Sequence, residues 1–323
     1  MYPIVLFFLC VMWVDISALD KVDIIAPSSK GKKQNLILIK KYIEKLNLKA
    51  HISEKIYSNN NLFYSNSDKF RADDLINALI DDSRIIWCIR GGKGASRLIP
   101  YLEKLPDSQK KKIAQNKKIF IGYSDNTVLH LYLQMKFDWQ TIHGTTLEQI
   151  VNEKVDQGSV DKLTALILGT QHSIKLNNLK LINNQLKSQS LKSKIIGGNM
   201  TLVENSIGTT WQVDAKSKIL FLEDVGVYPY EMERSLDHMK QANILDKVDA
   251  VIFGDFTKSD NSALTEIVKK RFAQSVDFPV FTISGIGHGY VNDPLPLNCR
   301  TVIKVEKPEE GLFSMEINFH NSA

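Results

Sequence analysis

Cysteine is scarce in this sequence of 323 residues, which contains only Cys10, Cys88 and Cys299. None of the three belongs to a CxxC pair or lies at a spacing typical of metal ligands. Cys88 lies within the apolar run at 85–89, which favours a buried hydrophobic side chain over a reactive thiol. A disulfide between Cys88 and Cys299 would require their Cα atoms to lie within about 7 Å, and we do not expect one.

Motifs for metals, nucleotides and nucleic acids are also absent. The chain has no HExxH, no GxGxxG and no P-loop, so we expect neither a metal nor another cofactor. Its 41 basic and 36 acidic residues give a formal charge of +5, and the lysines are dispersed. Without a dense basic patch, the sequence argues against a nucleic-acid partner.

Only one long apolar run occurs, at residues 4–14. It is shorter than the roughly 20 residues that span a bilayer, so we expect no stable membrane insertion. Its length suits the core of a signal peptide, and Ser17-Ala18 resembles a cleavage site. We therefore expect a cleaved leader at 1–18 and a periplasmic location. Because residues 1–3 contain no Lys or Arg, a cytoplasmic location stays the alternative.

Apolar segments in the first half alternate between the periods of strands and helices. Strands are expected at 22–26, 85–89 and 118–121, with helices between them. This alternation predicts an α/β fold, with a Rossmann-like parallel sheet in an N-terminal domain at 19–150.

The composition then becomes polar, and we expect a connection between domains at 151–194. Further strands are expected at 218–222, 250–253 and 280–283, separated by helices at 230–240 and 262–274. They predict a smaller C-terminal α/β domain at 195–323.

A serine lies where a buried strand is expected to turn into a helix, in Gly122-Tyr123-Ser124-Asp125-Asn126. At such a turn, free amides and the helix dipole stabilise negative charge. The segment is similar to a nucleophile elbow, with Asn126 in place of the second glycine. Ser124 is therefore a candidate nucleophile. The alternative is that Ser124 or Asp125 only caps the helix.

A serine nucleophile needs a general base, usually histidine. Of the seven histidines, His288 stands out because Gly285, Gly287 and Gly289 flank it after an expected strand. His143, just before Gly144, could also line a site. A structural histidine is the alternative for either residue.

The base in turn needs an acid that fixes its tautomer. Glu223 and Asp224 follow directly after the apolar strand at 218–222, and only one of them can take that role. Near another strand end, Arg90-Gly91-Gly92 predicts a concave anion site. The amides of Gly92 and Asp125 could form an oxyanion hole there.

Together these segments resemble the serine LD-carboxypeptidase family. The likeness covers nearly the whole chain after the leader, in this order: Ala26-Pro27-Ser28-Ser29, Arg90-Gly91-Gly92, Gly122-Tyr123-Ser124-Asp125, His143-Gly144, Gly197-Gly198-Asn199, Phe221-Leu222-Glu223-Asp224-Val225-Gly226, Gly287-His288 and Leu295-Pro296-Leu297. Lys93, Thr145 and Asn298 depart from the family pattern at the rim of the site, which bears on substrate preference.

The resemblance implies Ser124 as nucleophile, His288 as general base and acid, and Glu223 as the residue that orients His288. It implies a site in the cleft between the two domains, a homodimer, and a peptidoglycan stem peptide as substrate. Substrate contacts are expected from Gly92, Asp125, Arg90, His143 and Asn199. The expected reaction removes D-alanine from a tetrapeptide stem, and pentapeptide stems are also considered. The identity of the diamino acid stays open.

Two alternatives remain at this point. The microcin-immunity branch of the family cleaves a peptidyl nucleotide and would need an aromatic side chain able to stack on the base. A non-catalytic periplasmic solute-binding protein would explain the leader and two lobes. It would not explain an elbow serine together with a glycine-flanked histidine.

Overall fold

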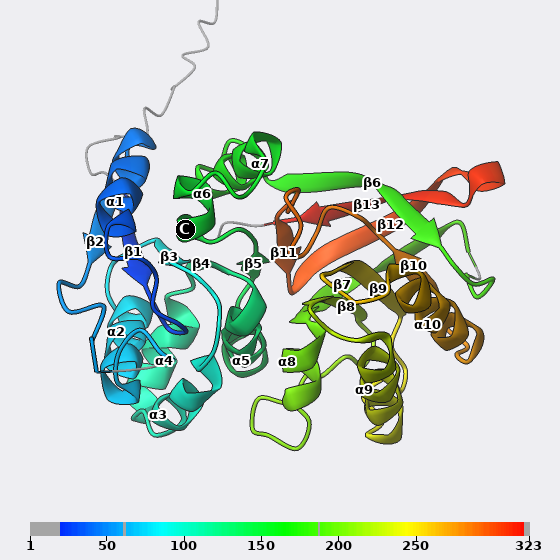
Figure 1. The fold of residues 1–323 in the computed structure, drawn as a ribbon, viewed down its shortest axis with the longest axis horizontal. Helices are drawn as coiled ribbons and strands as arrows, with labels where there is room; N and C mark the ends of the chain where they lie inside the picture. Colours follow the sequence, from blue (N-terminus) through cyan, green and yellow to red (C-terminus); the bar gives the residue numbers. More distant parts are fainter. Residues whose placement is uncertain (1–19, 61–62, 187, 320–323) are drawn as a thin grey trace, which may run out of the picture.

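The computed structural model describes residues 20–60, 63–186 and 188–319, which form two sheets with helices around them (Figure 1). The expected signal peptide at 1–18 lies outside the described residues. Among the helices of the described ranges, none has the length and apolarity needed to cross a membrane.

The first sheet has six strands in the order β11-β5-β4-β3-β1-β2, and only β11 is antiparallel to its neighbour. Its strands are β1 (Lys21–Ile25), β2 (Lys49–Ile52), β3 (Ile85–Cys88), β4 (Ile119–Gly122), β5 (Thr141–His143) and β11 (Leu295–Leu297). Its helices are α1 (Asn35–Lys45), α2 (Asp68–Ile80), α3 (Ile99–Glu103), α4 (Asp107–Gln115), α5 (Thr127–Phe137) and α6 (Leu147–Val151).

Helices cover both faces of this sheet. Ile24 packs in one core with Ile39 of α1, whereas its neighbour Ile25 packs in the other core with Leu75 of α2. Successive strand residues point to opposite faces, so burial on both faces requires a continuous apolar run. The expected parallel sheet of an α/β fold is confirmed.

The second sheet is a closed barrel in the order β10-β6-β13-β12-β7-β8-β9. Its strands are β6 (Ser173–Leu181), β7 (Ser190–Asn199), β8 (Ile219–Val225), β9 (Ala250–Thr257), β10 (Val280–Thr282), β12 (Cys299–Lys307) and β13 (Leu312–Asn318). Helices α7 (Gln157–Ile167), α8 (Met200–Asn205), α9 (Pro229–Gln241) and α10 (Ser262–Gln274) accompany it. Neighbouring strands from β7 to β10 are parallel, so their carboxyl ends share one edge.

The stretch at 151–194 differs from the expected connection, because it contains α7, β6 and half of β7. Along β6, buried residues alternate with exposed ones, since one face lines the barrel and the other meets solvent. The exposed positions account for the polar composition of this stretch. Conversely, β11 lies in the second half of the chain but pairs with β5 of the first sheet.

The two domains meet where α5 begins, beside α8 (Figure 1). The amide of Asn199, at the end of β7, donates to Thr127 Oγ1 at 3.0 Å. A Cβ added to Gly198 would lie 2.6 Å from the same oxygen, so this close approach requires glycine. The elbow before α5 is thereby held against the carboxyl edge of the barrel.

Candidate active site

Ser124 occupies a sharp turn between β4 and α5. Its φ is +62°, in the left-handed region that costs a non-glycine residue on the order of 1 kcal/mol. Gly91 packs directly on it, since a Cβ at Gly91 would lie 2.8 Å from the Cβ of Ser124. Such strain persists only where the surroundings enforce it, and it is typical of functional turns.

Asn126 helps to enforce this turn. Its Nδ2 donates to the Tyr123 carbonyl at 3.1 Å and to the Arg90 carbonyl at 3.4 Å. A Cβ at Gly122 would lie 2.9 Å from that nitrogen. The amide of Asn126 therefore occupies the space beside Gly122 and links the elbow to the loop after β3.

Asp125 turns its side chain away from the serine. The carboxylate accepts hydrogen bonds from Ser28 Oγ at 2.6 Å and from the Ala95 amide at 2.8 Å. Burial raises the pKa of this carboxyl group, although these donors oppose the rise. The Asp125 side chain thus anchors the elbow. In the part of the chain that the structure describes, the amides of Asp125 and Gly92 donate to no protein acceptor.

Glu223 and His288 are brought together from β8 and from the loop after β10. His288 Nδ1 lies 2.7 Å from Glu223 Oε2. Glu223 is completely buried, and burial raises the pKa of its carboxyl group against the attraction of the imidazole. The ring of His288 keeps a small exposed area, 12% of the side chain.

Asp224, the other candidate acid, points elsewhere. Its carboxylate accepts from Asn199 Nδ2 at 2.8 Å and from the Thr201 amide at 2.9 Å, at the start of α8. Asn199 itself caps α8 by accepting from the Leu202 amide. The geometry therefore separates two adjacent carboxylates, one beside a histidine and one at a helix terminus.

Tyr123 joins the elbow to His288. The two rings are tilted by 50° with centroids 4.8 Å apart. Gln149 of α6 donates to the Tyr123 hydroxyl oxygen. Sequence reasoning missed Gln149 as a support of the site, because only folding brings it to Tyr123.

Within residues 20–60, 63–186 and 188–319, Ser124 Oγ has no hydrogen-bond partner.

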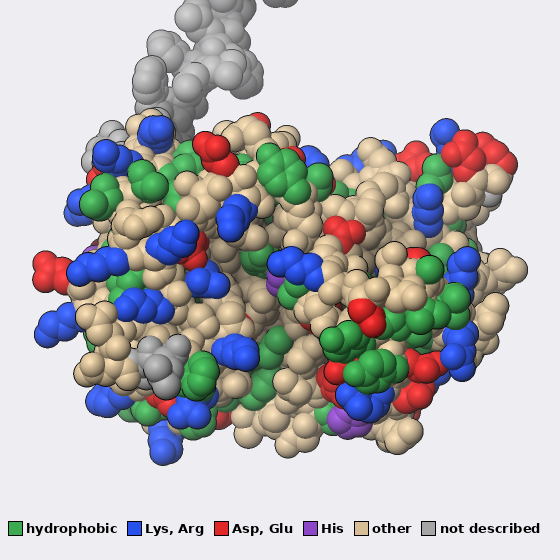
Figure 2. Space-filling model, in the orientation of Figure 1, with side chains coloured by type: hydrophobic (Ala, Val, Ile, Leu, Met, Phe, Trp, Pro, Cys, Tyr) green, Lys and Arg blue, Asp and Glu red, His purple; other side chains and the backbone are tan. Residues whose placement is uncertain are grey.

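Arg90 lies at the rim, with 43% of its side chain exposed. Its guanidinium is 3.4 Å from Glu148 Oε2 and donates to the Lys30 carbonyl at 3.2 Å. Figure 2 shows a hollow between the two halves of this face, with many Lys and Arg side chains over the first domain. Arg90 is thus held in place while part of it faces solvent.

His143 lies beneath the site rather than on its surface. It is fully buried against Tyr123 and Phe221, with ring centroids 5.7 Å and 5.6 Å away. Neither ring nitrogen has a hydrogen-bond partner among the described residues. Burial holds the pKa of His143 well below its ordinary value. The ring is a neutral packing element under Tyr123.

His130, below the elbow, gives a pH-dependent stability. Burial lowers the pKa of His130 to about 4, against about 6.5 in the unfolded chain. As the pH falls from 6.5 towards 4, His130 becomes protonated in the unfolded chain but stays neutral in the folded protein, so the folded state loses stability. This effect amounts to about 2 kcal/mol between pH 7 and pH 4.5. His130→Gln is expected to reduce the pH dependence by that amount in urea denaturation.

The exposed His172 provides the matched control for this measurement. His172→Gln should leave the pH dependence of unfolding unchanged. Identical pH dependence in the parent and His130→Gln would contradict the role of His130.

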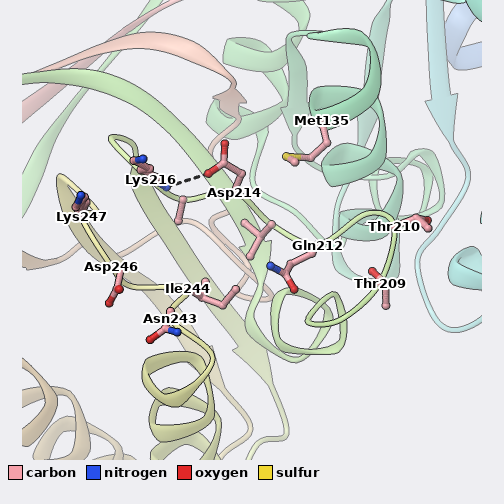
Figure 3. A pocket seen from close by; sticks show the side chains of 12 residues that line it. Met135, Thr209, Thr210, Gln212, Asp214, Lys216, Asn243, Ile244, Asp246 and Lys247 are labelled. Carbon is pink, nitrogen blue, oxygen red and sulfur yellow. Dashed lines mark hydrogen bonds between the residues drawn. The ribbon is translucent and has the colours of Figure 1, made fainter.

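A separate pocket lies near the amino ends of β8 and β9, away from the edge that carries Glu223 (Figure 3). Met135 of α5 reaches it from the first domain, and Gln212, Asn243 and Lys247 line it from the second. None of the predicted site residues lines this pocket.

Two family models match this chain. The LD-carboxypeptidase N-terminal domain matches residues 22–144, and the LD-carboxypeptidase C-terminal domain matches residues 192–303. Together they contain the elbow, Glu223 and His288.

Individual proteins agree with the family models. A Rickettsia conorii protein, provisionally named as a carboxypeptidase, is 41% identical over 285 residues, covering 87% of each chain. The murein tetrapeptide carboxypeptidase of Pseudomonas aeruginosa is 25% identical over 299 residues, covering 88% of this chain and 93% of that protein. The crystal structure of muramoyltetrapeptide carboxypeptidase from Oxalobacter formigenes shares the fold, with a TM-score of 0.80 at 21% identity over 93% of this chain and 99% of that one. This chain belongs to the LD-carboxypeptidase family.

Proposed function

We propose that this protein is a serine LD-carboxypeptidase that releases the terminal D-alanine from tetrapeptide stems of peptidoglycan and leaves a tripeptide. The observation that carries the proposal is the 2.7 Å pair of Glu223 and His288, packed against the elbow that presents Ser124. Family membership and the name of the Pseudomonas aeruginosa relative support the substrate class.

In this reaction Ser124 Oγ attacks the carbonyl carbon of the diamino acid residue, and His288 Nε2 takes the hydroxyl proton. Glu223 accepts the Nδ1 proton in a hydrogen bond and stabilises the imidazolium that forms. The amides of Gly92 and Asp125 donate to the developing oxyanion. His288 then gives its proton to the amine of D-alanine as the C–N bond breaks, and water hydrolyses the acyl-enzyme. The hydrogen bond from Ser124 to His288 forms when substrate binds, as is common for catalytic contacts.

Arg90 is proposed to bind the carboxylate of the terminal D-alanine. It adjoins Gly91, which packs on Ser124, and Glu148 fixes its guanidinium.

Arg90→Ala is expected to raise KM for the tetrapeptide about tenfold, because one exposed charge-assisted contact contributes about 1.4 kcal/mol. Initial rates at several substrate concentrations measure this change. Arg300→Ala, which removes an exposed arginine of β12 in the barrel, is the matched control and should keep KM within about twofold. Equal KM values for Arg90→Ala and Arg300→Ala would refute the assignment.

The deciding experiment incubates the purified protein with tetrapeptide and pentapeptide muropeptides and determines the product masses. Loss of D-alanine from the tetrapeptide supports the proposal, and pentapeptides establish whether longer stems are also cut. Stems containing diaminopimelate or lysine identify the preferred diamino acid. Intact substrates after prolonged incubation would refute the assigned reaction.

Export to the periplasm and homodimerisation are also proposed. Export follows from the apolar leader in the sequence, and the dimer follows from the family resemblance. N-terminal sequencing of protein from cells should find a start at residue 19, whereas an intact Met1 would contradict cleavage. Light scattering should give a mass twice that of one chain.

A peptidyl nucleotide is the second candidate substrate. Tyr228, which precedes α9, and Tyr230, in the first turn of α9, stack on each other at 5.6 Å, and 44% and 61% of their surfaces are exposed. Such a pair offers the aromatic surface that a nucleobase needs. Cleavage of an aminoacyl nucleotide but not of muropeptides would favour this function.

A further inference from the structure

The loop that carries His288 is wrapped around Asp255 of β9. The amide of Gly285 donates to Asp255 Oδ2 at 3.0 Å. A Cβ added to Gly287 would lie 3.2 Å from the Cβ of Asp255, and one added to Gly289 would lie 3.5 Å from Asp255 Oδ2. All three glycines that flank His288 therefore pack against one side chain. These contacts give the glycine pattern around His288 a structural reason.

Asp255 holds this loop through both its backbone amide and its side chain. Its amide donates to the Ile286 carbonyl at 2.9 Å, while its carboxylate accepts from the preceding residue, Gly285. Gly287 then lies between Asp255 and Glu223, because a Cβ there would also be 3.0 Å from Glu223 Oε2. The next residue is His288, whose distance from Glu223 therefore depends on where Asp255 holds the loop.

An irregularity in the barrel places Asp255 there. Leu222 pairs with Phe253, but Asp224 pairs with Phe256, so β9 has one more residue than β8 opposite Glu223. The extra length falls at Gly254 and Asp255. Bulges of this kind redirect a side chain and recur beside active sites.

We propose that Asp255 is a positioning residue that fixes the His288 loop so that the imidazole faces Glu223. The proposal rests on the proposed function of His288 as the general base. Lys180, Glu266 and Lys269 line the same cavity as Asp255. Burial raises the pKa of Asp255, while the Gly285 amide and the positive charge of Lys269 favour its ionised form. Because Asp255 touches no reacting atom, its effect reaches the reaction only through His288.

The test compares Asp255→Ala with Asp255→Asn. Asparagine keeps a side-chain oxygen that accepts from the Gly285 amide, whereas alanine removes it. Asp255→Ala is expected to lower kcat about a hundredfold with KM within about twofold, the scale of a misplaced catalytic group. Asp255→Asn should keep kcat within about fivefold of the parent. Thermal unfolding of both variants shows that each is folded at the assay temperature.

A second readout needs no substrate. The Nδ1 proton of His288, observed by NMR in the free protein, reports its hydrogen bond to Glu223, and Glu223→Gln assigns the signal. This signal should persist in Asp255→Asn and disappear in Asp255→Ala. If the parent protein lacks peptidase activity but the NMR signal behaves as expected in the two variants, only the proposed function is refuted. If the parent is active and the folded Asp255→Ala variant keeps both its kcat and its NMR signal, the inference is overturned. Equal losses of kcat and of the NMR signal in Asp255→Ala and Asp255→Asn would also overturn it.

Discussion

Under the proposed function, Ser124→Ala is expected to lower kcat for D-alanine release by about 10⁶-fold. The variant keeps the amides of Gly92 and Asp125 and the binding contacts, so a residual rate above the uncatalysed reaction should remain. KM should change little, because the hydroxyl forms its decisive bond only during the reaction. Mass analysis of products after long incubation measures rates this small.

The fold of the variant should be unaffected. Alanine accepts the φ of +62° no worse than serine does, and Ser124 Oγ has no hydrogen-bond partner to lose in the described part of the chain. Ser96→Ala, an exposed serine in the nearby 3-10 helix Ala95–Leu98, is the matched control and should retain full activity. Activity within tenfold of the parent in Ser124→Ala would show that another group performs the attack.

The positions of these residues along the chain were predictable, because each follows an apolar run that forms a buried strand. Ser124 lies at the carboxyl end of β4 in the first sheet, whereas Glu223 and His288 lie near the carboxyl ends of β8 and β10 in the barrel. The glycines near His288 also marked a tight loop. A single sequence therefore carries local information on where a site can form.

The strand pattern alone could not decide between Glu223 and Asp224, and only the family resemblance named Glu223, because the choice depends on which way each side chain points. Alternation along β8 directs one towards His288 and the other towards α8. Only the pairing of β7, β8 and β9 fixes that direction. The sequence alone could not identify Asp255 for the same reason, since its role arises from a bulge of β9 relative to β8.

The barrel was the least predictable part of the fold. Strands β6 and β12 each have one exposed face, and β13 includes the partly exposed Glu316 and Asn318, so none of the three is a continuous apolar run like those that marked the other strands. Their closure also pairs segments more than a hundred residues apart, as in the contact of β6 with β13. Sequence periodicity reports local burial, and it contains no direct record of such long-range pairing.

Glu223→Gln is expected to lower kcat on the order of 10⁴-fold while leaving the protein at least as stable at pH 7. Glutamine has nearly the same shape, but it cannot stabilise the imidazolium with a negative charge. The pKa of Glu223 is raised by burial, so the folded protein holds that proton more tightly than the unfolded chain. Ionisation of Glu223 therefore costs stability as the pH rises above about 4.5, and the neutral amide removes this cost.

Asp224→Asn, at the adjacent position, is expected to lose stability and to keep its activity, the opposite of Glu223→Gln. Its carboxylate accepts from Asn199 Nδ2, the Thr201 amide and the Thr201 hydroxyl, and an amide cannot accept all of these hydrogen bonds. We expect it to lose about 1–3 kcal/mol in the free energy of unfolding and to keep kcat within about tenfold. Urea denaturation and initial rates on both variants measure the two effects. If Glu223→Gln lost stability and kept its activity, the carboxylate would serve packing alone, and His288 would need another group to orient it.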